Sequence, residues 1–366
     1  MREIVVSLPE GRTYRVLIDA SLFSWDGWLS RILFPSPRGV ILTNDRVGEL
    51  YAEKVQEFFA RHGYTVDTIA IPDGEEHKNL KTVEEVYHRL LALDLDRKSF
   101  LLTLGGGVVT DLGGFVASTF LRGIAYYQIP TSLLAQVDSS VGGKTGVNLE
   151  EGKNLVGTFY QPSGVLVDLS FLSTLPEREY REGLAEVVKA ALLEGEEFVS
   201  FLLANRREIL QREERVLEET VARAIAYKKG IVERDEKEKG LRSVLNYGHT
   251  IGHALEKATG YGVLRHGEAV GVGMLGEAIL AVRIGVSTEK MCDLQRRMLE
   301  EFGLPLRVPR KVGAEEFLSA LRRDKKKGGG KVRFTLLECP GKPILGVEVE
   351  EEMVLQILPE LCEVQV

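Results

Sequence analysis

The strongest constraint on the fold is the alternation of short β-branched apolar runs with helix-like segments in the first half of the chain. Five such runs are expected to form strands, at residues 39–44 (GVILTN), 65–71 (TVDTIAI), 99–107 (SFLLTLGGG), 124–130 (IAYYQIP) and 163–169 (SGVLVDL). Helix-like segments at 47–62 and 81–93 separate the first three runs. This alternation predicts a parallel sheet with helical crossovers, in which ligands bind at the carboxyl ends of the strands.

The second half of the chain has a helical pattern. Residues 182–194 carry apolar side chains at the spacing of an amphipathic helix, and residues 206–229 predict a second helix whose many charges form a solvated face. The segment 1–18 indicates a hairpin, and the segment 331–349 indicates a late hairpin or loop. We expect two domains, an α/β nucleotide-binding domain with a Rossmann-like parallel sheet at 1–172 and a mainly α-helical domain at 173–366.

The composition is that of a globular protein, with 44% hydrophobic and 28% charged residues among 366. No apolar run approaches the roughly 18 residues of a membrane-spanning helix, so no membrane partner is expected. A net charge of −7 argues against nucleic acid as the main partner, whereas a local group of basic residues still suits a small anion. The three cysteines have no CxxC spacing, which favours a reducing cytoplasm and neither a disulfide framework nor a thiolate metal site.

Two glycine-rich segments have the composition of phosphate-binding loops. The glycines at 105–107 end a predicted strand directly before an apparent helix, where they would allow the backbone to approach a phosphate. The segment lacks the GxGxxG fingerprint, so a simple tight turn is an equal alternative. Gly143-Lys144-Thr145 resembles the end of a P-loop, but Asp138 stands where the first glycine is required, which excludes the ATPase interpretation. Lys144 is still a candidate for contact with a substrate anion.

Three of the six histidines, His249, His253 and His266, lie close together in the sequence. A helix that begins near His249 would place His249, His253 and Glu256 one turn apart, on a different face from its apolar residues. Histidines at positions i and i+4 are a common metal-ligand pair, but the glutamate of the HExxH motif is absent. From spacing alone, metal ligands and satisfied polar residues at a helix start are both open.

A further ligand has to come from elsewhere in the chain. Glu186 and Lys189 are a charged pair inside the otherwise apolar part of the predicted helix 182–194. A carboxylate in such surroundings is costly unless it is paired or coordinated. The alternative is a simple ion pair within the helix, worth only tenths of a kcal/mol.

Taken together, these motifs resemble those of the 3-dehydroquinate synthase family of sugar phosphate cyclases, over nearly the whole chain. The segments that carry the resemblance are 72–78 (PDGEEHK), 105–111 (GGGVVTD), 130–148 (PTSLLAQVDSSVGGKTGVN), 153–157 (KNLVG), 184–189 (LAEVVK), 245–253 (LNYGHTIGH) and 266–268 (HGE). One departure is visible, because Ser132 stands where the family usually has a second threonine. The hydroxyl group is kept at that position.

The resemblance implies roles for individual residues. It implies three ligands for zinc or cobalt, which are Glu186, His249 and His266. It implies an NAD site formed by Asn44, Glu75, Lys78, Gly106, Gly107, Val108, Asp111, Thr131, Ser132, Leu134, Asp138, Phe171, Thr174, Leu175 and Glu179, with Lys144 and Lys153 also in contact. It implies a phosphate grip formed by Arg122, Lys144, Asn154 and the segment Asp324-Lys325-Lys326. The other polar groups around the substrate are then Lys153, Lys189, Lys228, Arg242, Asn246 and His253.

The resemblance also implies the reaction. The substrate would be 3-deoxy-D-arabino-heptulosonate 7-phosphate, and the product 3-dehydroquinate, an intermediate of the shikimate pathway to aromatic amino acids. Transient oxidation by NAD, elimination of phosphate, reduction, ring opening and an intramolecular aldol step would follow one another without net redox change. Zinc would act as Lewis acid and template, and the cationic residues would orient the substrate.

Three alternatives remain open at this point. Another cyclase of the same superfamily would act on a different sugar phosphate, but Lys228 and Arg242 suit a substrate carboxylate. A metal-dependent polyol dehydrogenase would release NADH, and a non-catalytic nucleotide-binding or scaffold protein would have no use for a ligand triad beside a cation cluster. A homodimer is the expected assembly, although the sequence itself does not give the oligomeric state.

Overall fold

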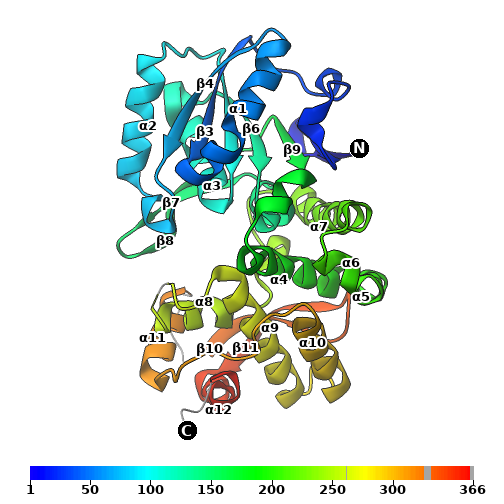
Figure 1. Cartoon of the computed structure of the whole chain (residues 1–366). Helices are drawn as coiled ribbons and strands as arrows, with labels where there is room; N and C mark the ends of the chain where they lie inside the picture. The colour runs from blue at the N-terminus through cyan, green and yellow to red at the C-terminus, as the bar shows by residue number, and fades with distance from the viewer. Residues whose placement is uncertain (261, 325–330, 363–366) are drawn as a thin grey trace. The chain divides into compact units, whose positions relative to one another are not determined.

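The computed structural model describes residues 1–260, 262–324 and 331–362. The chain forms two compact units (Figure 1): unit 1 is Met1–Pro176 with Leu217–Glu233, and unit 2 is Glu177–Val216 with Arg234–Val366. Helix α7 (Glu214–Arg234) therefore contributes its central part to unit 1, where Arg2 forms an ion pair with Glu218 at 2.9 Å. The domain boundary expected at 172/173 would place all of α7 in the C-terminal domain, whereas residues 217–233 belong to unit 1 here. The expected boundary stays a prediction.

Unit 1 is built on a seven-stranded sheet in the order β1-β2-β9-β6-β5-β3-β4. The strands are β1 (Arg2–Ser7), β2 (Thr13–Asp19), β3 (Arg38–Asn44), β4 (Thr65–Ile71), β5 (Phe100–Gly105), β6 (Ala125–Pro130) and β9 (Gly164–Asp168). The pair β1–β2 is the expected antiparallel hairpin, and the remaining neighbours are parallel. The predicted parallel sheet is confirmed, with every predicted strand within about two residues of its observed bounds.

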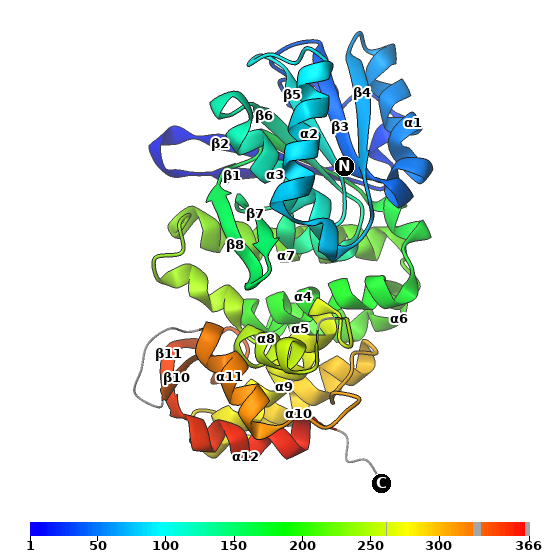
Figure 2. The same ribbon diagram turned by 90° about the vertical axis from the view of Figure 1, so that its left-hand side faces the viewer.

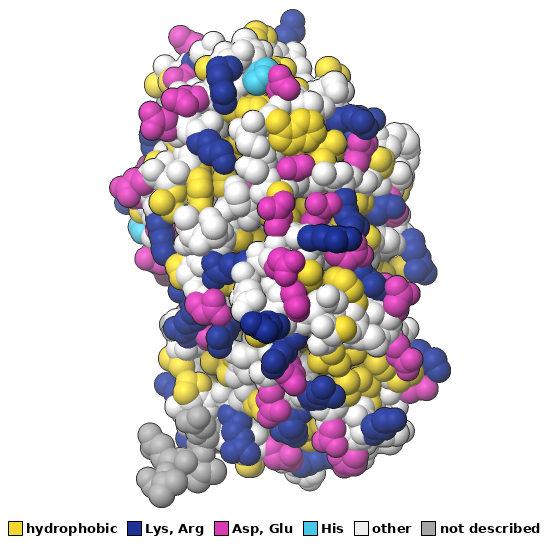
Figure 3. All heavy atoms as spheres, turned by 45° about the vertical axis from the view of Figure 1, so that its right-hand side comes forward, with side chains coloured by type: hydrophobic (Ala, Val, Ile, Leu, Met, Phe, Trp, Pro, Cys, Tyr) yellow, Lys and Arg dark blue, Asp and Glu magenta, His cyan; other side chains and the backbone are white. Residues whose placement is uncertain are grey.

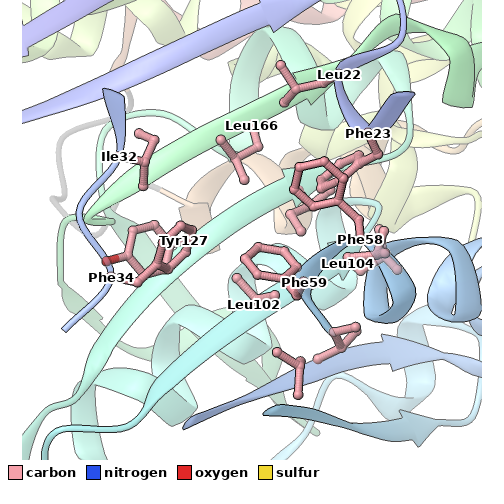
Figure 4. Close-up of a cluster of buried hydrophobic side chains, with 14 of the residues drawn as sticks. Leu22, Phe23, Ile32, Phe34, Phe58, Phe59, Leu102, Leu104, Tyr127 and Leu166 are labelled. Carbon is pink, nitrogen blue, oxygen red and sulfur yellow. The ribbon is translucent and has the colours of Figure 1, made fainter. Parts of the chain in front are cut away.

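Helices cover both faces of this sheet, which explains why its central strands are apolar throughout. Helix α1 (Asp45–Arg61) packs on one face, and α2 (Leu80–Ala92) and α3 (Gly107–Thr119) pack on the other (Figures 1 and 2). Under α1 lies an aromatic cluster in which Phe23 contacts Phe58 edge to face (Figure 4). Trp28 stacks on Phe58 in the same cluster. A separate antiparallel pair, β7 (Lys144–Leu149) and β8 (Gly152–Phe159), packs against α3. Lys144 thus begins a strand, not the helix that a P-loop requires.

Unit 2 is mainly helical, as expected. Its helices are α4 (Glu177–Glu194), α5 (Glu196–Ala204), α6 (Arg206–Leu210), α8 (His249–Ala258), α9 (His266–Arg283), α10 (Glu289–Glu301), α11 (Ala314–Asp324) and α12 (Glu351–Leu361). Of the two alternatives for the late segment, the hairpin is present, as β10 (Lys331–Leu337) and β11 (Pro343–Glu350). Helix α9 is buried along most of its length, because α4, α8, α10 and α12 all pack against it.

The charged stretch 206–229 differs from the single predicted helix. It is divided into α6 and α7, because Arg212 adopts a left-handed backbone conformation with φ of 60° between them. Nine side chains of α7 are buried, among them Lys228, so its charges do not form one solvated face. On the face that Figure 3 shows, acidic and basic side chains are interspersed. Among the described residues, no helix is both long and apolar enough to cross a membrane.

Candidate active site

Three helices of unit 2 bring one carboxylate and two imidazoles together. Glu186 lies in the middle of α4, whereas His249 and His266 are the first residues of α8 and α9. The Nε2 atoms of His249 and His266 lie 3.5 and 3.6 Å from Oε1 of Glu186. Ligand atoms of all three residues lie within 4.8 Å of one another. This is the set that the family resemblance implied, drawn from positions up to 80 residues apart in the sequence.

Glycines explain how the three helices approach so closely. A Cβ atom on Gly267, directly after His266, would lie 2.1 Å from the carbonyl oxygen of Glu182 on α4. A Cβ atom on Gly273 of α9 would lie 1.9 Å from the carbonyl oxygen of Gly248, directly before His249. Helix α9 is therefore in backbone contact with both α4 and the start of α8. Any larger residue at Gly267 or Gly273 would push the histidines away from Glu186.

The carboxylate of Glu186 is only 2% exposed and lies among positive or polar groups. Lys189, one turn along α4, forms an ion pair with it and also donates to the carbonyl oxygen of Leu245 at 2.8 Å. Burial alone would raise the pKa of Glu186, but Lys189 and the two imidazoles outweigh that effect and hold the pKa well below its usual range. Burial and the Lys189 ammonium lower the pKa of His249 well below its usual value. Glu186 is thus a charged carboxylate beside a neutral imidazole.

These residues fit a divalent metal ion. Two imidazoles and one carboxylate are a known ligand set for catalytic zinc, which keeps a fourth position open for substrate. Both carboxylate oxygens of Glu186 are buried. Oε2 is ion-paired with Lys189, whereas Oε1 faces, among the described residues, only the two imidazole Nε2 atoms, at 3.5 and 3.6 Å. A buried carboxylate oxygen with no closer partner among those residues is unusual for a protein interior, and Oε1 together with the two Nε2 atoms suits a shared cation. The Nδ1 atom of His249 lies 3.1 Å from the carbonyl oxygen of Tyr247, which leaves Nε2 to face Glu186.

His253 lies beside this group but is not part of the compact set. Its ring centroid is 5.2 Å from that of His249 and 5.8 Å from that of His266. Just before α8, Arg242 is buried at 1% exposure and donates to the carbonyl oxygen of Glu236 at 2.6 Å. Asn246 is exposed and donates to Glu238 at 3.3 Å.

In unit 1, several predicted cofactor contacts gather at the carboxyl edge of the sheet. Asn44 ends β3 and caps α1 by accepting from the Val47 N–H at 2.8 Å. Gly106 and Gly107 follow β5 and begin α3, and the Thr131 N–H after β6 donates to the carbonyl oxygen of Gly105 at 3.0 Å. The neighbouring residues Val108, Ser132 and Leu134 are all partly exposed at this edge. The structure therefore brings together residues that the sequence could only place on separate strands.

Lys78 connects two further predicted residues beside that edge. Its ammonium donates to Asp111 at 2.5 Å and to Asn154 at 2.6 Å, although Lys78 itself is only 4% exposed. Burial raises the pKa of Asp111, and the Lys78 ammonium partly offsets that rise. Asn148 joins Glu75 to this cluster through a hydrogen bond of 2.7 Å to its carboxylate.

A second, partly buried pair in unit 1 joins Lys228 of α7 to Asp138, at 2.6 Å to the carboxylate and 2.6 Å to the carbonyl oxygen. Phe171, Thr174 and Leu175 lie at or directly after the short helix that follows β9, where Tyr51 contacts Thr174.

The remaining predicted residues are more dispersed. Arg122 and Lys144 are exposed, Lys153 is half-buried on β8, and Glu179 in unit 2 lies 3.5 Å from Arg265. The segment 325–330 lies outside the described residues, so Lys325 and Lys326 stay predictions.

Two carboxylates beside the candidate metal site were not among the predicted residues. Glu268 on α9 pairs with Arg178 on α4 at 2.7 and 2.8 Å. Glu277, buried in the apolar part of α9, accepts from the Gly248 N–H at 2.7 Å. The signal for Glu277 was present in the sequence, since it is a lone carboxylate in the apolar stretch 269–281, the same pattern that singled out Glu186.

Solved structures with this fold define the class of the chain. It is similar to 2-deoxy-scyllo-inosose synthase complexed with carbaglucose-6-phosphate, NAD+ and Co2+, at 28% identity, a TM-score of 0.91 and coverage of 98% of this chain and 100% of that one. It is also similar to ValA (2-epi-5-epi-valiolone synthase) from Streptomyces hygroscopicus with NAD+ and Zn2+ bound, at 29% identity, a TM-score of 0.88 and coverage of 97% and 98%. An iron-containing alcohol dehydrogenase shares the fold alone, at 13% identity and a TM-score of 0.67 over 95% of this chain and 97% of that one. The fold is that of the sugar phosphate cyclases.

Sequence comparisons give the family within that class. The model described as 3-dehydroquinate synthase N-terminal matches residues 68–182, and the model described as 3-dehydroquinate synthase C-terminal matches residues 183–327. The 3-dehydroquinate synthase of Thermodesulfovibrio yellowstonii is 43% identical over 98% of this chain and 100% of its own length. That of Pelobacter propionicus is 46% identical over 91% of this chain and 92% of its own. The chain belongs to the 3-dehydroquinate synthase family.

Proposed function

We propose that this chain converts 3-deoxy-D-arabino-heptulosonate 7-phosphate to 3-dehydroquinate and phosphate, with NAD and a divalent zinc or cobalt ion as cofactors. The family supports the reaction. The observation that carries the metal requirement is the buried group of Glu186, His249 and His266, with ligand atoms within 4.8 Å of one another. When bound, NAD supplies reversible hydride acceptance and the metal supplies Lewis acidity.

The residues of unit 2 hold the ligand atoms in place. Lys189 keeps Glu186 charged, and the carbonyl oxygen of Tyr247 fixes the ring of His249 so that Nε2 faces Glu186. His253, beside both histidine ligands, is proposed to move a proton to or from a substrate oxygen. Arg242 and Asn246 are proposed to orient the carboxylate and hydroxyl groups of the substrate.

The residues of unit 1 are proposed to bind NAD and to contribute cations. Asn44, the glycines 105–107 and Thr131 lie at the carboxyl edge of a parallel sheet, the usual position of a nucleotide. The helix α3 that follows the glycines offers free amides to a pyrophosphate. Arg122, Lys144, Lys153, Asn154 and Lys228 are proposed to contact the anionic groups of the substrate, because charge-assisted hydrogen bonds suit phosphate and carboxylate.

The direct test is incubation of the protein with NAD, zinc or cobalt, and the heptulosonate phosphate. We expect release of inorganic phosphate in proportion to dehydroquinate, with NAD in catalytic amount and no accumulation of NADH. Formation of NADH in step with loss of substrate would contradict the proposal and favour a polyol dehydrogenase. Turnover of a sugar phosphate without a carboxylate, in place of the heptulosonate, would favour another cyclase of the same class.

Two further expectations, on the oligomeric state and the cellular location, complete the proposal. A homodimer is tested by sedimentation velocity, where a monomer at micromolar concentration would contradict it. A cytoplasmic location is supported by the three cysteines, which are all free thiols.

A further inference from the structure

The peptide group between Tyr247 and Gly248 makes two hydrogen bonds beneath the candidate metal site. Its carbonyl oxygen lies 3.1 Å from Nδ1 of His249, and a carbonyl oxygen can only accept, so Nδ1 carries the proton. Its N–H donates to Oε2 of Glu277 at 2.7 Å. A buried carboxylate is therefore linked through a single peptide group to the imidazole of His249.

The position of Glu277 makes this link unusual. Its side chain is fully buried in α9, the same helix that begins with His266. A buried carboxylate is costly, and an ordinary main-chain acceptor would satisfy the Gly248 N–H without that cost. Gly248 itself is held in a left-handed conformation with φ of 80°, and its Cβ position is closed by Met274 at 2.5 Å. The peptide group thus has one orientation, and Glu277 lies on its donor side.

We propose that Glu277 is a positioning residue for the metal ligand His249 and acts through the Tyr247–Gly248 peptide group. This inference rests on the metal site of the proposed function. The negative charge of the Glu277 carboxylate, beside the Gly248 N–H, polarises the peptide group. This makes the Tyr247 carbonyl oxygen a stronger acceptor for the Nδ1–H of His249. A stronger hydrogen bond at Nδ1 fixes the ring and makes Nε2 a better donor to a metal ion.

A purely structural role for Glu277 is the competing explanation, because a carboxylate near the start of α8 also stabilises that helix. The two roles differ in what they do to metal binding. A structural residue stabilises the protein equally with and without metal. A positioning residue adds a loss that appears only when the metal is bound, together with a change in the metal's own spectrum.

The experiment measures Co2+ binding to the full chain by competition with a chelator, and records the visible absorption of bound Co2+. The variants are Glu277→Met, which removes the acceptor at similar volume, and Glu277→Gln, which keeps an acceptor oxygen but removes the charge. We expect Glu277→Met to weaken Co2+ binding by about 10–100-fold. Glu277→Gln should weaken it by a smaller factor of at least about 3-fold, and both should shift the absorption bands.

Tyr180→Phe is the matched control. Tyr180 is buried on α4, the helix of Glu186, and its hydroxyl donates to the carbonyl oxygen of Ile209 at 2.7 Å. Its loss removes a buried hydrogen bond from unit 2 without touching the Tyr247–Gly248 peptide group, so Co2+ affinity and spectrum should stay as in the unaltered protein. If Glu277→Met does not fold, Glu277→Gln alone decides the matter.

The outcomes separate this inference from the metal site itself. Affinity and spectrum of the Glu277 variants equal to those of Tyr180→Phe would overturn the positioning role while leaving the metal site intact. Failure of the unaltered protein to bind Co2+ at one equivalent would remove the metal site, and this inference with it.

Discussion

The two units build their candidate sites in different ways. In unit 2, side chains from three helices meet around a single buried carboxylate, that of Glu186, whose Oε2 is ion-paired with Lys189 and whose Oε1 faces, among the described residues, only two imidazoles at 3.5 and 3.6 Å. In unit 1, polar residues from helices, a strand and loops already pair with one another. Lys78 donates to both Asp111 and Asn154, and Lys228 donates to Asp138.

The difference indicates what each site requires of its ligand. A metal ion in unit 2 would complete an arrangement that is prepared for a cation, at little cost in rearrangement. An anion in unit 1 would have to exchange partners with carboxylates that now neutralise the lysines. Variants in unit 2 should therefore change metal affinity and stability together, whereas variants in unit 1 should change ligand affinity with smaller effects on stability.

The largest expected effect is on the stability of the metal-free protein. Lys189→Met leaves the buried carboxylate of Glu186 without its ammonium partner, which should cost about 3–5 kcal/mol in the free energy of unfolding. Saturating zinc should recover part of that loss, because it neutralises the same carboxylate. Urea unfolding with and without zinc measures both quantities.

Lys229→Met is the control in unit 1, since the pair of Lys229 with Glu233 is partly exposed. It should cost less than about 1 kcal/mol and show no response to zinc. Equal losses of unfolding free energy in the two variants would mean that the buried pair of Lys189 and Glu186 contributes no more than a partly exposed surface pair.

The second prediction separates the ligands from the histidine beside them. His266→Ala should weaken zinc binding by more than about 100-fold, because loss of a ligand costs more than loss of its hydrogen-bonded partner. His253→Ala should keep near-stoichiometric metal and lose most of its turnover. Metal content after dialysis, measured by mass spectrometry beside the activity, gives the result. Metal lost from the His253 variant but retained by the His266 variant would instead restore the helical pair of His249 and His253.

The third prediction concerns unit 1. Lys144→Ala should weaken binding of the phosphate-bearing substrate by about 1.5–3 kcal/mol, the value of a hydrogen bond to a charged group, and leave NAD affinity almost unchanged. Lys98→Ala, at an exposed loop position in the same unit, should change neither. Calorimetric titration with each ligand measures the two affinities. Equal weakening of NAD and substrate would assign Lys144 to the cofactor.

Local patterns in the sequence were sufficient for most of the fold. Alternating apolar runs gave the parallel sheet, and His249 was predicted as a helix start because apolar residues follow it at helical spacing. The break between α6 and α7 was missed, because it depends on the left-handed conformation of Arg212, a residue type without a strong turn signal.

The candidate site could not be predicted from local patterns, because it is formed by contacts between distant parts of the chain. Nothing in the spacing of His249 and His266 points to Glu186, and the family resemblance was needed to join them. The close approach of Gly267 to the carbonyl oxygen of Glu182 is a property of helix packing, which no local pattern contains. The roles given to individual residues of both units stay predictions.

The smallest expected effect tests how firmly α9 is tied to α4 beside the metal ligands. Arg178 pairs with Glu268, which also accepts the backbone N–H of Arg265 at 2.9 Å and so caps the helix that begins with His266. Burial alone would raise the pKa of Glu268, but the Arg178 guanidinium and the Arg265 amide outweigh it and lower that pKa. Arg178→Met should cost about 0.5–1 kcal/mol near pH 7, because Arg178 is more than half exposed and solvent screens the pair.

The lowered pKa of Glu268 fixes how the stabilisation by the Arg178–Glu268 pair changes with pH. A glutamate whose pKa is lowered by folding stabilises the protein above its ordinary pKa, and that stabilisation is lost as the pH falls through the lowered value. The difference in unfolding free energy between the unaltered protein and Arg178→Met should therefore be full near pH 7 and shrink below about pH 4. Urea unfolding across that range measures it. A difference that stays constant would mean that Arg178 contributes through packing of its aliphatic part, and that the link between α4 and α9 depends on the glycine contacts alone.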